Sequence, residues 1–125
     1  MQIARWNTSP RNESDGVSSY LLVSGITTGS RHLTALLIEM QAGSLQRRAS
    51  REYEQCCFIL EGEGMMTVGD ESGRIGPGDC IFIPAGVPSG LVNDGNGVLV
   101  FFSTSAPSSS EGFLEDWQPP GVEGG

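Results

Sequence analysis

A cluster of basic residues occupies the middle of the 125-residue sequence: Arg47, Arg48 and Arg51 are three of its seven lysines and arginines. A guanidinium carries a permanent charge and presents a planar set of donors that matches a carboxylate or a phosphate. Short charge clusters also occur in solvated surface loops. The sequence therefore leaves two interpretations open, an anion-binding site and an exposed basic loop.

The cysteines form no spaced disulfide framework. Cys56 and Cys57 are adjacent, and Cys80 is the third, an arrangement poorly suited to an ordinary bridge. We therefore expect reduced thiols and a cytoplasmic location. If residues alternate along a strand from Gln55, Cys57 faces the interior and Cys56 faces away, which favours small core residues over metal ligands. His32 is the only histidine, and a lone histidine near a strand start is more often structural than functional.

Short apolar runs separated by turn residues fill most of the chain, which contains 18 glycines and seven prolines. The length allows one domain and is too short for two. Runs of strand-forming residues predict strands at 2–6, 18–24, 32–40, 53–60, 65–68, 80–83, 91–92 and 98–102, with a hairpin turn at 70–73. Many short strands with turn signals between them predict an all-β barrel or sandwich.

Glycine, proline and asparagine recur at fixed spacing in two stretches. The first, residues 43–62, reads GSLQRRASREYEQCCFILEG, and the second runs from Gly78 through Pro84 and Gly86 to Asn93. With this framework the chain resembles the cupin superfamily, whose two motifs usually read G-x5-H-x-H-x3,4-E-x6-G and G-x5-P-x-G-x2-H-x3-N. The resemblance implies an all-β fold, a cupin jelly-roll β-barrel in a single domain.

Three segments follow from this assignment. Residues 1–17 form an N-terminal arm that can supply an edge strand, and residues 18–105 form the cupin barrel. Residues 106–125 form an acidic C-terminal tail rich in serine, proline and glycine.

The resemblance also implies a metal site, but other residues occupy the ligand positions. The two histidines of the first motif correspond to Ala49 and Arg51, its glutamate to Gln55, and the histidine of the second motif to Ser89. Ala49 donates nothing, and Arg51 would repel a cation. A first-row metal needs about three or four imidazole, carboxylate or thiolate donors. We therefore expect no metal and no other cofactor.

Five residues are candidates for binding a ligand. By the resemblance, Arg51, Gln55 and Ser89 point into the barrel, and strand alternation adds Tyr53 and Asn93. This lining would fix the orientation of a small molecule through hydrogen bonds.

A guanidinium inside the barrel needs a counter-ion, because burying an unpaired charge costs several kcal/mol. For Arg51 the sequence offers two interpretations. One is an internal carboxylate, with Glu39 and Glu52 as candidates, and the other is the anionic group of a ligand.

Three functions from different classes remain open, and whether the protein is an enzyme is undetermined. We prefer non-catalytic binding of a small polar or anionic molecule, such as a carboxylate or a polar ring, without a metal. The second is a metal-independent isomerase, epimerase or cyclase, as the resemblance allows, with Tyr53 as a weak candidate for the acid or base. The third is a metal enzyme with atypical ligands such as Cys57, Gln55 and a glutamate.

The formal net charge of −8 makes nucleic acid and anionic membranes poor partners, because both need a basic surface. No apolar run is long enough to predict a transmembrane helix. The resemblance implies a homodimer, and the edge strands of an open barrel favour pairing. Residues 2–6 are the expected contribution to a partner's sheet.

Overall fold

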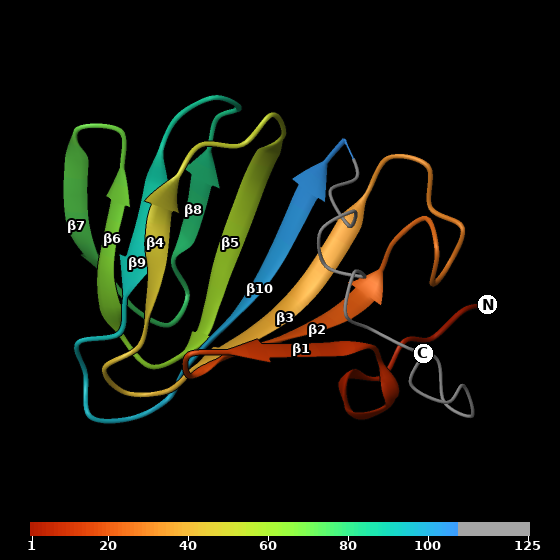
Figure 1. Cartoon of the computed structure of the whole chain (residues 1–125), viewed down its shortest axis with the longest axis horizontal. Coiled ribbons are helices and arrows are strands. Elements are labelled where there is room, and N and C mark those ends of the chain that lie inside the picture. The colour runs from red at the N-terminus through yellow and green to blue at the C-terminus, as the bar shows by residue number, and fades with distance from the viewer. Residues whose placement is uncertain (108–125) are drawn as a thin grey trace.

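The computed structural model describes residues 1–107, and its regular secondary structure is almost entirely β-strand (Figure 1). Within this range no helix is long and apolar enough to cross a membrane. Nearly all of the predicted C-terminal tail lies outside the described residues. A short 3-10 helix, η1 (Trp6–Thr8), precedes the strands β1 (Arg11–Ser14), β2 (Val17–Val23), β3 (Thr34–Met40), β4 (Leu45–Ala49), β5 (Glu54–Glu61), β6 (Gly64–Val68), β7 (Glu71–Ile75), β8 (Cys80–Ile83), β9 (Ser89–Val92) and β10 (Leu99–Ala106).

The strands form two antiparallel sheets (Figure 1). The larger sheet has the order β1-β2-β3-β10-β5-β8, and the smaller has the order β4-β9-β6-β7. Strands distant in sequence are neighbours in both sheets, since β10 lies between β3 and β5, and β9 lies between β4 and β6. Such long-range antiparallel pairing across two sheets is the jelly-roll arrangement. The predicted all-β jelly roll is therefore confirmed.

Alternation along the strands directs one set of apolar side chains into a shared core. On β10, Leu99 and Phe101 are buried, and Phe101 pairs with Ile59 of β5. Full burial of an apolar side chain of this size stabilises a fold by roughly 1.5–3 kcal/mol. The core cluster consists of Ile38, Met40, Cys57, Ile59, Met66, Ile75, Ile83, Leu91, Leu99 and Phe101.

The N-terminal segment differs from the prediction, and the expected strand at residues 2–6 is wrong. Trp6 begins the 3-10 helix, and its ring meets Tyr20 edge to face with centroids 5.3 Å apart. The edge strand is β1, which pairs with β2 through a two-residue turn at Asp15 and Gly16, with φ of 50° and 82°. An Asp-Gly pair is a strong hairpin signal. The Asp15-Gly16 pair was not interpreted as a hairpin turn because the residues before it are polar and do not form an apolar strand pattern.

Strand β4 was not predicted, because its sequence shows no alternation and most of its side chains are exposed. It forms by pairing with β9, where Leu45 lies opposite Val92. Tertiary pairing therefore decides its conformation, and local propensity does not.

The turn between β6 and β7 lies earlier than predicted. Val68 pairs with Glu71, so Gly69 and Asp70 form a two-residue loop, whereas a turn at 70–73 was expected. Gly69 has a φ of 59°, which glycine adopts without steric cost. The correction makes Glu71 the first residue of a strand and gives its side chain a defined face.

The turn after β5 depends on a glycine that packs against the backbone at the start of the neighbouring strand β10. Gly62 has a φ of 84°, and a Cβ added there would lie 2.3 Å from the carbonyl oxygen of Val98 and 2.8 Å from the Cα of Leu99. Backbone atoms in two strands cannot yield to such a contact without moving the strands. The glycine at the end of the first motif is therefore a packing requirement.

We expect Gly62→Ala to destabilise the protein by about 2–4 kcal/mol, through backbone strain and overpacking together. Urea denaturation would measure this loss as a lower midpoint. Gly76→Ala is the matched control, because an added Cβ at Gly76 meets nothing within 4 Å. A Gly62→Ala midpoint equal to that of the control would contradict this account.

Candidate functional site

A small cavity lies between the two sheets, where side chains of β4, β5 and β9 converge. Its volume is about 30 Å³. It contains three of the five predicted ligand-binding residues, Arg51, Gln55 and Ser89. The full lining is Gln46, Arg47, Arg51, Gln55, Cys57, Met66, Ile83, Ser89, Gly90, Leu91 and Phe101.

Gln55 forms the polar part of the inner wall. It lies on β5 between β10 and β8, opposite Ser105 and Ile83. Its Nε2 donates to the Oγ of Ser103 at 2.9 Å and to the Sγ of Cys57 at 3.6 Å. Because a hydroxyl both donates and accepts, a half-turn of the amide would place Oε1 against Ser103 and release Nε2 toward the cavity. The amide can therefore present either an acceptor or a donor to a ligand.

Two arginines form the mouth of the cavity, and both side chains are exposed. Arg51 makes one weak hydrogen bond, from Nη1 to the carbonyl oxygen of Ala49 at 3.4 Å. Among residues 1–107, the ion pairs involve only other arginines. Arg47 and Arg51 therefore reach the cavity without a carboxylate partner.

Of the two interpretations left open for Arg51, the internal carboxylate is absent from the described part of the chain, since neither Glu39 nor Glu52 pairs with it. The expectation rested on a buried guanidinium, and that premise is wrong. Residue 51 lies in the loop between β4 and β5, and its side chain reaches solvent. Because water solvates the guanidinium of Arg51, this group needs no carboxylate partner, whereas a buried guanidinium would need one.

Ser89 lies on the wall opposite Gln55. It begins β9, where it pairs with Ala49 on one side and with Val68 on the other. Its hydroxyl makes no hydrogen bond within residues 1–107. The hydroxyl can therefore donate to a group that enters the cavity.

Tyr53 and Asn93 are placed differently from the other candidates, and neither lines the cavity. Strand β5 begins at residue 54, so the alternation that was extended back to Tyr53 does not apply there. Asn93 is inside the fold, 1% exposed, but its amide is already bonded. Its Nδ2 donates to the carbonyl oxygens of Met40 and Gly97, both at 2.9 Å, and its Oδ1 accepts from the Gly95 amide at 3.1 Å.

Cys57 lies inside, as alternation predicted. Burial raises the pKa of its thiol to about 11, although hydrogen bonds with Ser103 and Gln55 offset part of that shift. The thiol is therefore protonated at neutral pH. A protonated thiol is a poor nucleophile.

The other two cysteines are exposed on the outer face of the larger sheet. Cys56 pairs with Phe82, and Phe58 pairs with Cys80, so the two cysteines are diagonal neighbours. Partial burial and then the adjacent Cys80 raise the pKa of the Cys56 thiol. Neither side chain reaches the cavity.

The cavity does not fit a metal ion. The motif positions supply one amide from Gln55, one hydroxyl from Ser89, no donor from Ala49 and a cation from Arg51. No three His, Cys, Asp or Glu side chains of residues 1–107 come together as a metal site. A first-row metal requires more donors than this set provides.

Sequence reasoning singled out Arg47 only as part of a basic cluster. Its spacing of four residues from Arg51 crosses the end of a strand, so no periodicity predicted that both would meet at one cavity.

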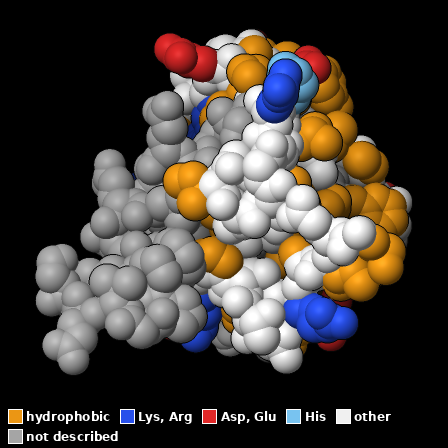
Figure 2. All heavy atoms as spheres, turned by 90° about the vertical axis from the view of Figure 1, so that its right-hand side faces the viewer, with side chains coloured by type: hydrophobic (Ala, Val, Ile, Leu, Met, Phe, Trp, Pro, Cys, Tyr) orange, Lys and Arg blue, Asp and Glu red, His pale blue; other side chains and the backbone are white. Residues whose placement is uncertain are grey.

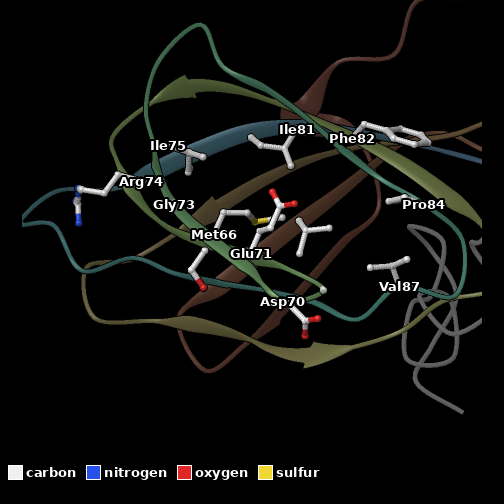
Figure 3. A pocket seen from close by; sticks show the side chains of 13 residues that line it. Met66, Asp70, Glu71, Gly73, Arg74, Ile75, Ile81, Phe82, Pro84 and Val87 are labelled. Atoms are coloured by element: carbon white, nitrogen blue, oxygen red, sulfur yellow. The ribbon is translucent and has the colours of Figure 1, made fainter.

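Sequence reasoning also missed a larger cleft of about 620 Å³, shown in Figure 3, which contains none of the four positions that correspond to metal ligands.

Comparisons with known proteins agree with this fold. An uncharacterized protein of Methanocaldococcus jannaschii is 39% identical over 57 residues, which are 46% of this chain and 46% of that protein. The chain thus matches about half the length of this curated relative. An RmlC-like cupin from Shewanella frigidimarina superimposes with a TM-score of 0.73 at 22% identity, covering 85% of this chain and 88% of that chain.

The polyketide cyclase RemF from Streptomyces resistomycificus has the same fold, with a TM-score of 0.74 at 20% identity over 86% of this chain and 80% of that chain. Identities at this level show the fold alone. The family model of the cupin domain matches residues 36–105, which include both motifs and more than half of the sequence. The chain belongs to the cupin family.

Proposed function

We propose that this cupin binds a small organic anion at the barrel cavity, without a metal. One observation carries the proposal: Arg47 and Arg51 flank the cavity, and neither has a carboxylate partner within residues 1–107. Guanidiniums arranged in this way are suited to a carboxylate, which can accept two parallel hydrogen bonds from one of them.

The size of the cavity limits the ligand. A cavity of about 30 Å³ has room for little more than one or two waters. A carboxylate group fits that space, whereas a polar ring does not fit without expansion of the barrel. The anionic group therefore enters the cavity, and the rest of the ligand extends past the arginines toward solvent.

The polar wall gives each side chain a role in this arrangement. Arg51 and Arg47 supply charge at the mouth, and the hydroxyl of Ser89 donates from one side. The amide of Gln55, held by Ser103 at 2.9 Å, donates from the other side after a half-turn. Donors on both walls orient the carboxylate and disfavour neutral molecules of the same shape.

Binding is favoured over catalysis because the cavity lacks a general acid or base suited to neutral pH. The pKa of Cys57 is about 11, and Tyr53 does not line the cavity. Similarity to a polyketide cyclase keeps a metal-independent cyclase, isomerase or epimerase as the alternative. A metal enzyme is the weakest of the three, because no three His, Cys, Asp or Glu side chains of residues 1–107 come together as a metal site.

We further propose a cytoplasmic homodimer. All three cysteines are free thiols, as expected in a reducing compartment. On the outer face of the larger sheet, Phe58 and Leu60 are 42% and 49% exposed. Exposed hydrophobic side chains also gather along one flank of the surface in Figure 2. A contiguous exposed apolar patch favours association.

Arg51→Ala should weaken acetate binding about 10- to 100-fold, because a hydrogen bond to a charged group contributes about 1.5–3 kcal/mol. Titration of the amide NMR signals of Gln55 and Ser89 with acetate would measure the Kd, and acetamide would serve as the neutral probe. Arg48→Ala is the control, because Arg48 donates to the carbonyl oxygen of Gly69 at 2.7 Å and does not line the cavity. Equal weakening in both variants would indicate diffuse electrostatics and contradict a specific site.

The raised pKa of Cys57 predicts a loss of stability at alkaline pH. The unfolded thiol, with a pKa near 9.0, deprotonates before the folded thiol, with a pKa of about 11. The stabilisation is therefore fully present below pH 9 and is lost as pH rises to about 11. Two pKa units correspond to about 2–3 kcal/mol. Chemical denaturation between pH 8 and 11 should show a smaller decline for Cys57→Val than for the wild type, and parallel curves would contradict the assignment.

Replacing Phe58 and Leu60 together by serine should convert a dimer to a monomer. Light scattering coupled to size-exclusion chromatography would report twice the 13.2 kDa chain mass for the wild type and one chain mass for the variant. Ile26→Ser is the control, because Ile26 is 69% exposed in the loop between β2 and β3. A monomeric wild type would refute the dimer.

A further inference from the structure

A second and larger recess opens where the barrel is not closed. Strand β8 is an edge strand of the larger sheet and β7 is an edge strand of the smaller sheet, and these two edges do not pair with each other. The cleft of about 620 Å³ lies between the β6–β7 hairpin and β8 (Figure 3). Ligand pockets for small molecules commonly have volumes of about 300–1,000 Å³. The lining is Met66, Val68, Gly69, Asp70, Glu71, Ser72, Gly73, Arg74, Ile75, Ile81, Phe82, Pro84 and Val87.

The wall of the cleft is mostly apolar, and a glycine leaves space within it. Register pairs Met66 with Gly73, so Gly73 lies on the inner face beside the buried Met66 and Ile75. A Cβ added at Gly73 would meet nothing within 4 Å. A side chain at this position would therefore project into the open cleft. The recess exists in part because position 73 has no side chain.

One carboxylate faces this apolar wall. Val68 pairs with Glu71, which places Glu71 on the same face of the hairpin as Met66. Figure 3 agrees, because the Glu71 side chain lies beside Met66 on the side of Ile81. No basic side chain of residues 1–107 forms an ion pair with Glu71. The carboxylate is thus available to a cationic ligand.

The basic residues near the cleft are occupied elsewhere. Arg74 points away from the cleft in Figure 3 and donates to both carboxylate oxygens of Asp94, at 2.9 and 3.1 Å, with Glu63 3.6 Å away. Arg48 reaches the rim and donates to the Gly69 carbonyl oxygen. Asp70 lies in the turn beside Gly69, whereas Glu71 is an exposed carboxylate on the strand face that carries Met66.

We propose that this cleft binds an organic ammonium compound, with its apolar body against Met66, Ile75 and Ile81 and its cationic group on Glu71. The combination of an apolar wall and one inward carboxylate selects that class by charge and by polarity. The proposal is independent of the anion site. The charge preference is opposite, and Met66 lies in the wall between the two recesses.

Titration with 2-phenylethylammonium, followed by the backbone amide NMR signals of residues 68–75, would test the proposal. We expect saturable shifts there, and none with 3-phenylpropionate, which has a similar body and the opposite charge. Glu71→Gln should weaken binding about tenfold or more. Gly73→Val should also weaken binding, because the new side chain would project into the cleft, where an added Cβ meets nothing within 4 Å.

Glu61→Gln and Gly76→Ala are the matched controls, and both should bind as the wild type does. An intact NMR spectrum of each variant would establish that it is folded. The proposal fails if the ammonium probe gives no saturable shift, if the carboxylate probe binds equally well, or if Gly73→Val binds normally. Hairpin signals that shift with protein concentration alone would show that a second copy occupies the cleft, which would also overturn it.

Discussion

A permanent charge cannot enter a small apolar barrel without a partner, and this constraint determines the site. The core around the cavity is made of side chains such as Ile83, Leu91 and Phe101, which offer nothing to a guanidinium. Arg47 and Arg51 therefore lie at the mouth, where water solvates them, while the neutral amide of Gln55 and the hydroxyl of Ser103 pair inside. The cavity therefore has neutral hydrogen-bonding groups inside and cations at its mouth. This arrangement is the basis for the proposed binding of a ligand whose anionic group enters the cavity first.

Much of the fold could be predicted from sequence, because its signals are local or nearly so. The paired glycines after β5 and the apolar run at the start of β10 are visible in the sequence itself, whereas the close approach of Gly62 to Val98 and Leu99 appears only in the fold. The missed strands had other causes. The Asp15-Gly16 turn was hidden in a polar segment, and β4 depends on β9, which lies more than 40 residues later in the chain.

The site was less predictable than the fold, because the alternation of inward and outward side chains was extended to residues outside the strand. Gln55 and Cys57 lie within β5 and face the interior as expected, whereas Tyr53 precedes the strand and does not line the cavity. Asn93 shows a different limit. Its inward position was anticipated, but only the structure shows that its amide is used by Met40, Gly97 and Gly95. The 620 Å³ cleft arises from a gap between two sheets, which no local pattern encodes.

The motif positions divide into two physical classes, and the division explains how the fold accommodates Ala49, Arg51, Gln55 and Ser89 at positions that the cupin motifs usually give to histidine and glutamate. Gly62 has a positive φ, and Asn93 ties the β9–β10 loop to β3. A change at either position would affect the backbone itself. Ala49 and Ser89 pair only through their backbones across β4 and β9, so their side chains contribute little to the scaffold. Because the first class shapes the barrel and the second only lines it, the side chains that line the cavity can change while the sheets keep their register.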